Sequence, residues 1–146
     1  MSKSSFEEVL KTKGVLYYTN VGDSMMPLIK QKSDILIIHD IEGHKIKEND
    51  VVLYKRDSGQ YVLHRIIKVR KSDYVIRGDN RYSSEYGITD DHIIGIFKGR
   101  IRNNEILKVD DVEYINYVKS IRRNYFINYI KYKIGRLKRV LLNGNH

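Results

Sequence analysis

Short runs of β-branched, aromatic and other apolar residues set the main limit on how this chain folds. The runs cover residues 15–18, 35–38, 51–54, 61–69, 74–76 and 93–101. Clusters of Gly, Asp, Asn and Ser separate them, and this pattern favours β-strands. Turn residues at 56–59 and 103–104 predict two hairpins. We therefore predict a mostly β fold, with an antiparallel sheet that curls into a barrel-like core.

Helices are predicted at both ends of this series of strands. Residues 4–14 contain two overlapping capping boxes and a glycine stop, so we expect a short helix near residues 5–13. After the last strand, the aspartates at 110–111 can cap a helical region that runs to about residue 142. Gly135 predicts a break within this second helical region.

The composition excludes several classes of protein. A chain of 146 residues suits one compact domain with an appendage. It has no cysteine, which excludes disulfides, thiolate nucleophiles, zinc ribbons and iron–sulfur clusters. The longest apolar runs have about four to six residues, whereas a bilayer-spanning helix needs roughly 20. Residues 1–14 lack the apolar segment of a signal peptide, so we expect a cytoplasmic chain without a transmembrane helix.

Basic charge is concentrated at the C-terminal end. Residues 114–146 contain eight Lys or Arg and no acid, whereas residues 1–113 contain 19 basic and 18 acidic residues. A block of this kind attracts polyanions. We therefore divide the chain into a body, residues 1–110, and a basic amphipathic tail, residues 111–146.

The tail combines this charge with a helical spacing of apolar residues. These residues recur mostly every three or four positions: Ile115, Val118, Ile121, Tyr125, Phe126, Tyr129, Ile130, Ile134, Leu137 and Leu141. Arg122 and Lys133 fall within the apolar sector, so the periodicity is imperfect. Three interpretations stay open: packing on the body, peripheral contact with an anionic membrane, and binding of an acidic peptide or nucleic acid. Packing is favoured, and nucleic acid is not expected as a partner.

Three segments contain side chains suited to hydrolytic chemistry. Ser24 lies in a turn-rich segment with the only proline, where a hydroxyl can be presented, although such turns are common. His64 lies within an apolar strand, where its desolvation needs a partner; the alternative is a core histidine bonded to backbone. Asp79 sits in a tight turn that it could simply cap. No two histidines have a helical metal-ligand spacing, so neither a metal nor a cofactor is expected.

The order of these segments resembles the signal peptidase I superfamily, which also includes the self-cleaving domain of SOS and phage repressors. The resemblance covers roughly residues 15–102. Its boxes are Ser24-Met25-Met26-Pro27, Asn49-Asp50-Val51-Val52-Leu53-Tyr54, His64-Arg65, Gly78-Asp79-Asn80-Arg81 with Ser84, and Ile94-Gly95. Each box is common alone, whereas their shared order and spacing are specific.

The resemblance implies a serine peptidase in which Ser24 matches the nucleophile. His64 stands where most bacterial signal peptidases have a lysine base, and His64 followed by Arg65 is similar to the endoplasmic-reticulum type. The exchange is chemically coherent, because an imidazole is already largely neutral at pH 7, whereas a lysine must be deprotonated by burial.

The remaining matches imply supporting roles. Asp79 matches an acid that either orients the imidazole or holds the turn that does so, with Asp90 or Asp91 as alternatives. Ser84 matches a serine that supports the base. The other supporting, oxyanion or turn positions are Gly22, Met25, Pro27, Arg65, Gly78 and Asn80. Because membrane signal peptidases usually have a serine at the position of Gly22, the resemblance assigns oxyanion stabilisation to the Ser24 backbone N–H and neighbouring amides.

These expectations converge on a serine endopeptidase that removes a leader or signal segment from a peptide or protein precursor through an acyl-enzyme. One alternative is a self-cleaving regulatory domain of the repressor type. That branch uses a lysine base and carries a helix-turn-helix domain, for which the 14 residues before the first predicted strand are too few. Another alternative is a non-catalytic module whose basic tail binds membrane or nucleic acid.

Overall fold

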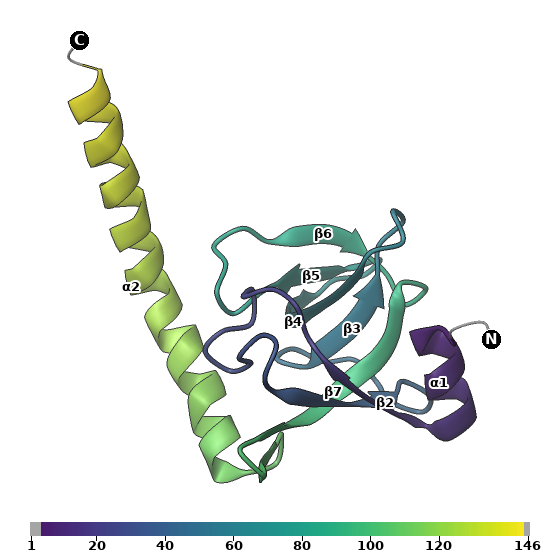
Figure 1. Ribbon diagram of the computed structural model, residues 1–146. Coiled ribbons are helices and arrows are strands. Elements are labelled where there is room, and N and C mark those ends of the chain that lie inside the picture. Colours follow the sequence, from purple (N-terminus) through teal and green to yellow (C-terminus); the bar gives the residue numbers. More distant parts are fainter. Residues whose placement is uncertain (1–3, 145–146) are drawn as a thin grey trace. The chain divides into compact units, whose positions relative to one another are not determined.

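A single eight-stranded antiparallel sheet forms the body of the chain in the computed structural model, which describes residues 4–144 (Figure 1). Its strands are β1 (Val15–Thr19), β2 (Ile35–Asp40), β3 (Val51–Lys55), β4 (Tyr61–Val69), β5 (Tyr74–Arg77), β6 (Glu85–Ile88), β7 (Ile93–Arg102) and β8 (Glu105–Lys108). They follow the order β1-β2-β7-β3-β4-β5-β6, and β8 pairs with β7. The predicted mostly β fold is confirmed. The sheet curls without closing into a barrel.

Helix α1 (Phe6–Lys13) precedes the sheet and matches the predicted helix. The Ser5 hydroxyl accepts a hydrogen bond from the Glu8 amide, and the Glu8 carboxylate accepts one from the Ser5 amide, which completes a capping box. Gly14 ends the helix with a φ of 75°, a left-handed conformation that glycine adopts without steric cost. The helix contacts β1, β2 and β7, and its Leu10 is buried.

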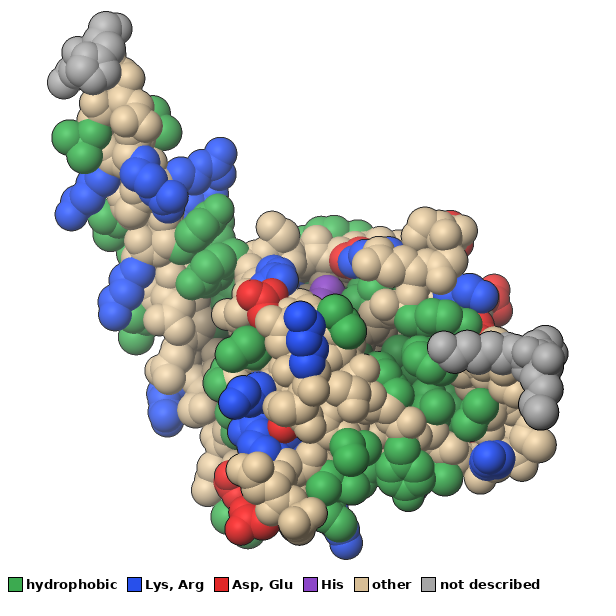
Figure 2. Space-filling view, viewed as in Figure 1, with side chains coloured by type: hydrophobic (Ala, Val, Ile, Leu, Met, Phe, Trp, Pro, Cys, Tyr) green, Lys and Arg blue, Asp and Glu red, His purple; other side chains and the backbone are tan. Residues whose placement is uncertain are grey.

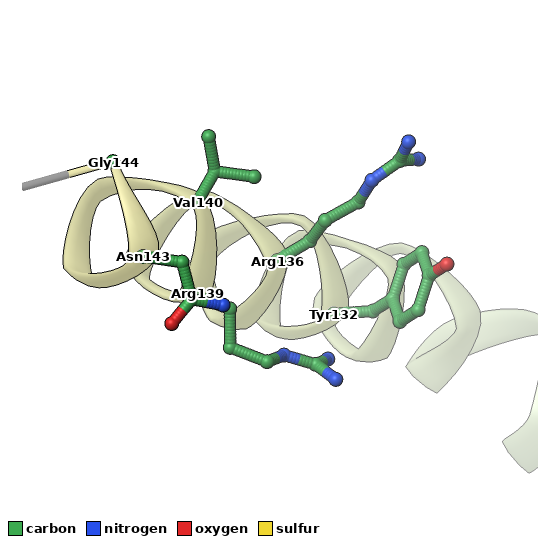
Figure 3. Close-up of a pocket in the computed structure, with 6 residues that line it drawn as sticks. All are labelled: Tyr132, Arg136, Arg139, Val140, Asn143 and Gly144. Atoms are coloured by element: carbon green, nitrogen blue, oxygen red, sulfur yellow. The ribbon is translucent and has the colours of Figure 1, made fainter. Parts of the chain in front are cut away.

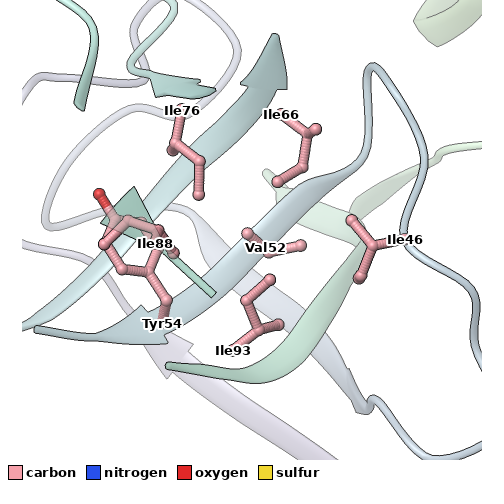
Figure 4. Packing of buried hydrophobic residues seen from close by; sticks show 7 residues of the cluster. All are labelled: Ile46, Val52, Tyr54, Ile66, Ile76, Ile88 and Ile93. Carbon is pink, nitrogen blue, oxygen red and sulfur yellow. The ribbon is translucent and has the colours of Figure 1, made fainter. Parts of the chain in front are cut away.

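Strand β3 lies in the middle of the sheet, between β4 and β7. Its register with β4 pairs Val52 with His64 and Tyr54 with Val62. Because directly paired residues of antiparallel strands point to the same face, His64 shares a face with apolar core residues. Figure 4 shows this core cluster, which consists of Ile46, Val52, Tyr54, Ile66, Ile76, Ile88 and Ile93. The candidate base therefore sits at the margin of a closely packed hydrophobic cluster.

Both predicted hairpins are present. The turn between β3 and β4 contains Gly59 with a φ of 90°, and Asn103 and Asn104, which both have positive φ, join β7 to β8. Strand β6 was not among the predicted strands. Its sequence, Glu-Tyr-Gly-Ile, has no apolar run, and it becomes a strand by pairing with β5.

Helix α2 (Val112–Asn143) runs without interruption through Gly135, so the predicted break is wrong. A single glycine within a helix costs about 1 kcal/mol relative to alanine, which good helix formers on both sides can offset. Contacts within the chain define two units, Met1–Asp111 and Val112–His146. Within residues 4–144, neither helix is both long enough and apolar enough to cross a membrane.

Candidate active site

Ser24 lies in the loop between β1 and β2, and hydrogen bonds within the loop shape its backbone. The Met26 amide donates to the Asp23 carbonyl at 3.1 Å, and the Ile29 amide donates to the Met25 carbonyl at 3.0 Å. The Met25 side chain is fully buried and anchors the loop, whereas Ser24 is half-buried and Pro27, after a cis peptide bond, is exposed. Ser24 is therefore partly accessible, next to a buried anchor of the loop.

Gly78 brings Ser24 and His64 together. A Cβ atom at Gly78 would lie 2.6 Å from the Ser24 carbonyl oxygen, 3.1 Å from Ser24 Cβ and 3.1 Å from His64 Nε2. Because both atoms are 3.1 Å from this point, Ser24 Cβ and His64 Nε2 are no more than twice 3.1 Å apart, beside a position that only glycine fits. Within the described residues the hydroxyl and the ring make no direct hydrogen bond. Such bonds are often long in unliganded enzymes and shorten when substrate binds.

The segment after β5 is bonded to the Ser24 loop. The Asn80 amide donates to the Ser24 carbonyl at 2.8 Å, and the Asn80 side chain donates to the Asp23 carbonyl at 3.1 Å. Arg81 Nη2 donates to the Asp23 carboxylate at 2.6 Å. The structure thus brings Gly78 and Asn80, both predicted site residues, directly against the candidate nucleophile.

Asp79 forms a buried ion pair with Arg65. Arg65 Nε and Nη2 each donate to one Asp79 carboxylate oxygen at 2.8 Å, and the two side chains are only 1% and 2% exposed. Arg65 Nη1 also donates to the Asn49 carbonyl at 2.8 Å. Of the two roles considered for Asp79, these contacts favour holding the turn, because its carboxylate is bound to Arg65 on β4.

The ring of His64 instead contacts a tyrosine that the sequence did not single out. Tyr54 Oη lies 3.3 Å from His64 Nδ1 and donates a hydrogen bond to Glu85 Oε2 at 2.6 Å. Arg56 Nε and Nη2 donate to the same carboxylate at 2.9 and 2.8 Å. Because the Tyr54 proton is directed to Glu85, its oxygen accepts the Nδ1–H of His64. This tautomer leaves the lone pair of Nε2 on the side of Ser24.

The protonation states along this path are set by burial and charge. Burial lowers the pKa of His64 to about 4, with a further lowering by the positive charge of Arg56, so the ring is neutral at pH 7. Hydrogen bonds from Arg56 lower the pKa of Glu85, which is therefore ionised. Burial and the bond to Glu85 raise the pKa of Tyr54, which therefore keeps its proton. The result is a neutral imidazole that contacts a protonated tyrosine, which is itself hydrogen-bonded to a carboxylate.

Other predicted supporting residues lie outside this path. Ser84 is half-buried and makes no hydrogen bond to His64 within the described chain; its neighbour Glu85 supports the ring through Tyr54. The Asp90 carboxylate accepts a hydrogen bond from Tyr74 Oη at 2.5 Å. Asp90 and Asp91 line a separate surface hollow beside residues 70–74.

The backbone amides of Gly22 and Ser24 differ in whether they already donate a hydrogen bond. The Gly22 amide donates to the Gln31 side chain at 3.0 Å, and Gly22 has a φ of 113°, which favours glycine. The Ser24 amide has no acceptor among the residues that the structure describes. Of these two amides, only that of Ser24 therefore has a free donor.

A second hollow lies on α2 and is lined by Tyr132, Arg136, Arg139, Val140, Asn143 and Gly144 (Figure 3). A single helix forms it, and it contains neither a hydroxyl with an adjacent base nor a carboxylate. Across the described part of the chain, no group of three or more His, Asp or Glu side chains could hold a metal ion. The cluster around Ser24 and His64 is thus the best-supported candidate site.

No protein-family model and no curated protein matches this chain. The resemblance to signal peptidases therefore rests on the ordered motifs. The geometry adds Tyr54, Glu85 and Arg56, which sequence reasoning missed as site residues. Tyr54 ends one of the matching boxes, but its link to Glu85 depends on strand pairings that a single sequence does not reveal.

Proposed function

We propose that this chain is a serine endopeptidase of the signal peptidase type, which cleaves a leader or signal segment from a peptide or protein precursor. The observation that carries the proposal is the meeting of Ser24 and His64 across Gly78. A buried core histidine would need only a backbone partner. Here Nδ1 contacts a tyrosine and Nε2 lies on the side of a half-buried serine.

The proposed chemistry follows from the two ring nitrogens. His64 Nε2 accepts the Ser24 hydroxyl proton as the oxygen attacks the scissile carbonyl, and the Ser24 amide stabilises the oxyanion. The C–N bond then breaks as His64 passes that proton to the leaving amine, which forms the acyl-enzyme. Water, deprotonated by His64, then attacks the ester. The ester C–O bond breaks, His64 returns the proton to the Ser24 oxygen, and the acyl part leaves as a carboxylic acid. No residue of this path needs a cofactor.

The surroundings of Ser24 suit an extended apolar peptide. Val21 and Met26 expose apolar side chains on either side of Ser24 in the loop, and Tyr82 does so just after the segment bonded to that loop. Exposed apolar side chains beside a nucleophile favour a substrate that carries an apolar segment. A signal segment has such an apolar region ahead of a cleavage site with small residues.

The proposal is tested without a known substrate by mass-spectrometric profiling of protein and peptide N-termini in cells that express the protein. We expect a defined set of processed N-termini to vanish in both Ser24→Ala and His64→Ala. The matched controls are Ser58→Ala, in an exposed hairpin turn, and His39→Ala, exposed on β2. Identical profiles for wild type and Ser24→Ala, with both proteins folded, would overturn the proposal. A cut only within the chain itself would favour the self-cleaving alternative.

A further inference from the structure

Helix α2 presents apolar side chains on two different faces. In its first half, the spacing of Tyr114, Tyr117, Val118, Ile121 and Tyr125 places them on one side, and all five are buried or half-buried. In its second half, another set shares a side: Phe126, Ile127, Ile130, Ile134, Leu137 and Leu141. We call this set the outer stripe. Ile121 and Ile130 are nine residues apart, which at 3.6 residues per turn places the two sets on opposite sides.

This change of side explains why the periodicity of the tail looked imperfect in the sequence. If the whole helix had a single apolar face, Arg122 and Lys133 would lie within it. Each lies outside the apolar face of its own half. The outer stripe is therefore a continuous apolar surface, and its six side chains are between 40% and 66% exposed. Tyr132, Val140 and Leu142 also expose apolar side chains, outside this stripe.

The outer stripe is surrounded by positive charge. Lys131 and Lys138 border one edge, Lys133 borders the other, and Arg136 and Arg139 lie on the remaining faces. No acidic residue follows Glu113. In Figure 2, Lys and Arg side chains alternate with hydrophobic ones along α2, with no acidic side chain on the visible face of the helix.

We infer that the second half of α2 binds flat in the interface of an anionic lipid bilayer, with the outer stripe inserted among the acyl chains. A lysine beside an apolar face can extend its charged end to the lipid phosphates while its alkyl stem stays in the apolar layer. Lys131, Lys133 and Lys138 occupy those edge positions. Arg139 lies on the hydrated side, opposite the outer stripe.

The combination of charge and apolar surface favours an anionic bilayer over a second copy of the chain or a nucleic acid. A second copy of the same segment would bring five basic residues against five more, and residues 1–113 are almost neutral. Nucleic acid would satisfy the basic side chains but would leave six large apolar side chains in water. An anionic bilayer satisfies both features in one surface.

The test uses the full chain with vesicles of phosphatidylcholine, with or without about 30% phosphatidylglycerol, in a sedimentation assay of vesicle binding. The chain has no tryptophan, so a single introduced tryptophan reports its own surroundings. We expect the emission of Leu137→Trp to shift to shorter wavelength with anionic vesicles only. Arg139→Trp, on the opposite side of the helix, should not shift.

Matched charge variants show whether vesicle binding depends on the lysines beside the outer stripe or only on the net charge of the chain. Removing three charges from the tail, by Lys131→Gln, Lys133→Gln and Lys138→Gln, should weaken vesicle binding at least tenfold. Removing three from exposed lysines of the body, by Lys11→Gln, Lys13→Gln and Lys45→Gln, should change it little. Equal loss in both triple variants would overturn the inference. Equal emission shifts of Leu137→Trp and Arg139→Trp would also overturn it, as would an emission shift that oligomerisation causes in the absence of lipid. Binding of the chain to DNA but not to vesicles would overturn it as well. A Ser24→Ala background leaves these results independent of catalysis.

Discussion

At the scale of single residues, the proposed function gives Tyr54 the task that an acid has in a serine protease triad. Its oxygen accepts the Nδ1–H of His64 and its own proton goes to Glu85, so the ring is held in one tautomer without direct contact with a carboxylate. Tyr54 is fully buried, and the pairing of β3 with β4, which places Tyr54 opposite Val62 and Val52 opposite His64, fixes its position beside the ring. We therefore regard it as a positioning residue for His64.

Tyr54→Phe removes this oxygen and keeps the buried ring. Because Nδ1–H then loses its acceptor, we expect kcat for precursor cleavage to fall about tenfold to a hundredfold with little change in KM, which is part of the 10²–10⁴ that general base catalysis contributes. Nitrogen NMR of His64 should show a mixed tautomer. Tyr74→Phe, which removes the hydroxyl bonded to Asp90, is the control. An unchanged kcat and tautomer in Tyr54→Phe would show that the contact has no such role.

Gly78→Ala tests the close approach that forms the site. The added methyl would stand 2.6 Å from the Ser24 carbonyl oxygen, so the Ser24 loop must move. We expect cleavage to be lost and the free energy of unfolding to fall by about 1–3 kcal/mol. Gly95→Ala creates a similar clash with Ile38 inside the sheet and is the matched control: it should lower stability and leave kcat per folded molecule unchanged. Full activity in folded Gly78→Ala would contradict the proposed geometry.

At the scale of elements, the Arg65–Asp79 pair connects β4 to the turn after β5. Asp79→Asn keeps the shape of the side chain but leaves the buried Arg65 charge without its counter-charge. We therefore expect the free energy of unfolding, measured by urea denaturation, to fall by about 3–5 kcal/mol. The double variant Arg65→Met/Asp79→Leu should recover much of this loss. Asp23→Asn, which removes the exposed partner of Arg81, should have a far smaller effect. Comparable losses from the two single variants would contradict this role.

The elements with strong local signals were predictable, and those that depend on distant pairing were not. Helix α1 carries its capping box and glycine stop within ten residues, and β3 and β4 are mostly apolar segments joined by a short turn. Strand β6 has no such signal, because it is a strand only beside β5. The same holds for the site. Ser24 and His64 stand in recognisable motifs, whereas Tyr54 and Glu85 are 31 residues apart and meet only through the order of the strands.

At the scale of the whole molecule, burial of a neutral His64 makes stability depend on pH. Its pKa in the folded chain is about 4, below the ordinary value of 6.5, so between these values the unfolded chain binds more protons. Stability is therefore fully present above pH 6.5 and falls as the pH is lowered toward 4. Glu85, whose pKa is lowered by Arg56, adds a further loss only below its ordinary value of 4.5.

Urea denaturation at pH 7, 6 and 5 measures this dependence. We expect the denaturation midpoint of the wild type to decrease across the series. His64→Asn, which has no proton to gain, should flatten the change between pH 7 and 5, whereas His39→Asn, at an exposed position on β2, should not. An equal decrease for wild type and His64→Asn would show that His64 is not the group responsible.

The three segments that meet at Ser24 are far apart along the chain, and under the proposed function this separation delays the appearance of a reactive serine during synthesis. Ser24 emerges from the ribosome with the first loop of the sheet, but His64 and Gly78 follow 40 and 54 residues later. Until β4 and the turn after β5 have folded onto that loop, the hydroxyl is an ordinary serine. In the proposed peptidase, a nascent or partly unfolded chain therefore cannot attack its neighbours, because the base reaches Ser24 only after these later elements have folded.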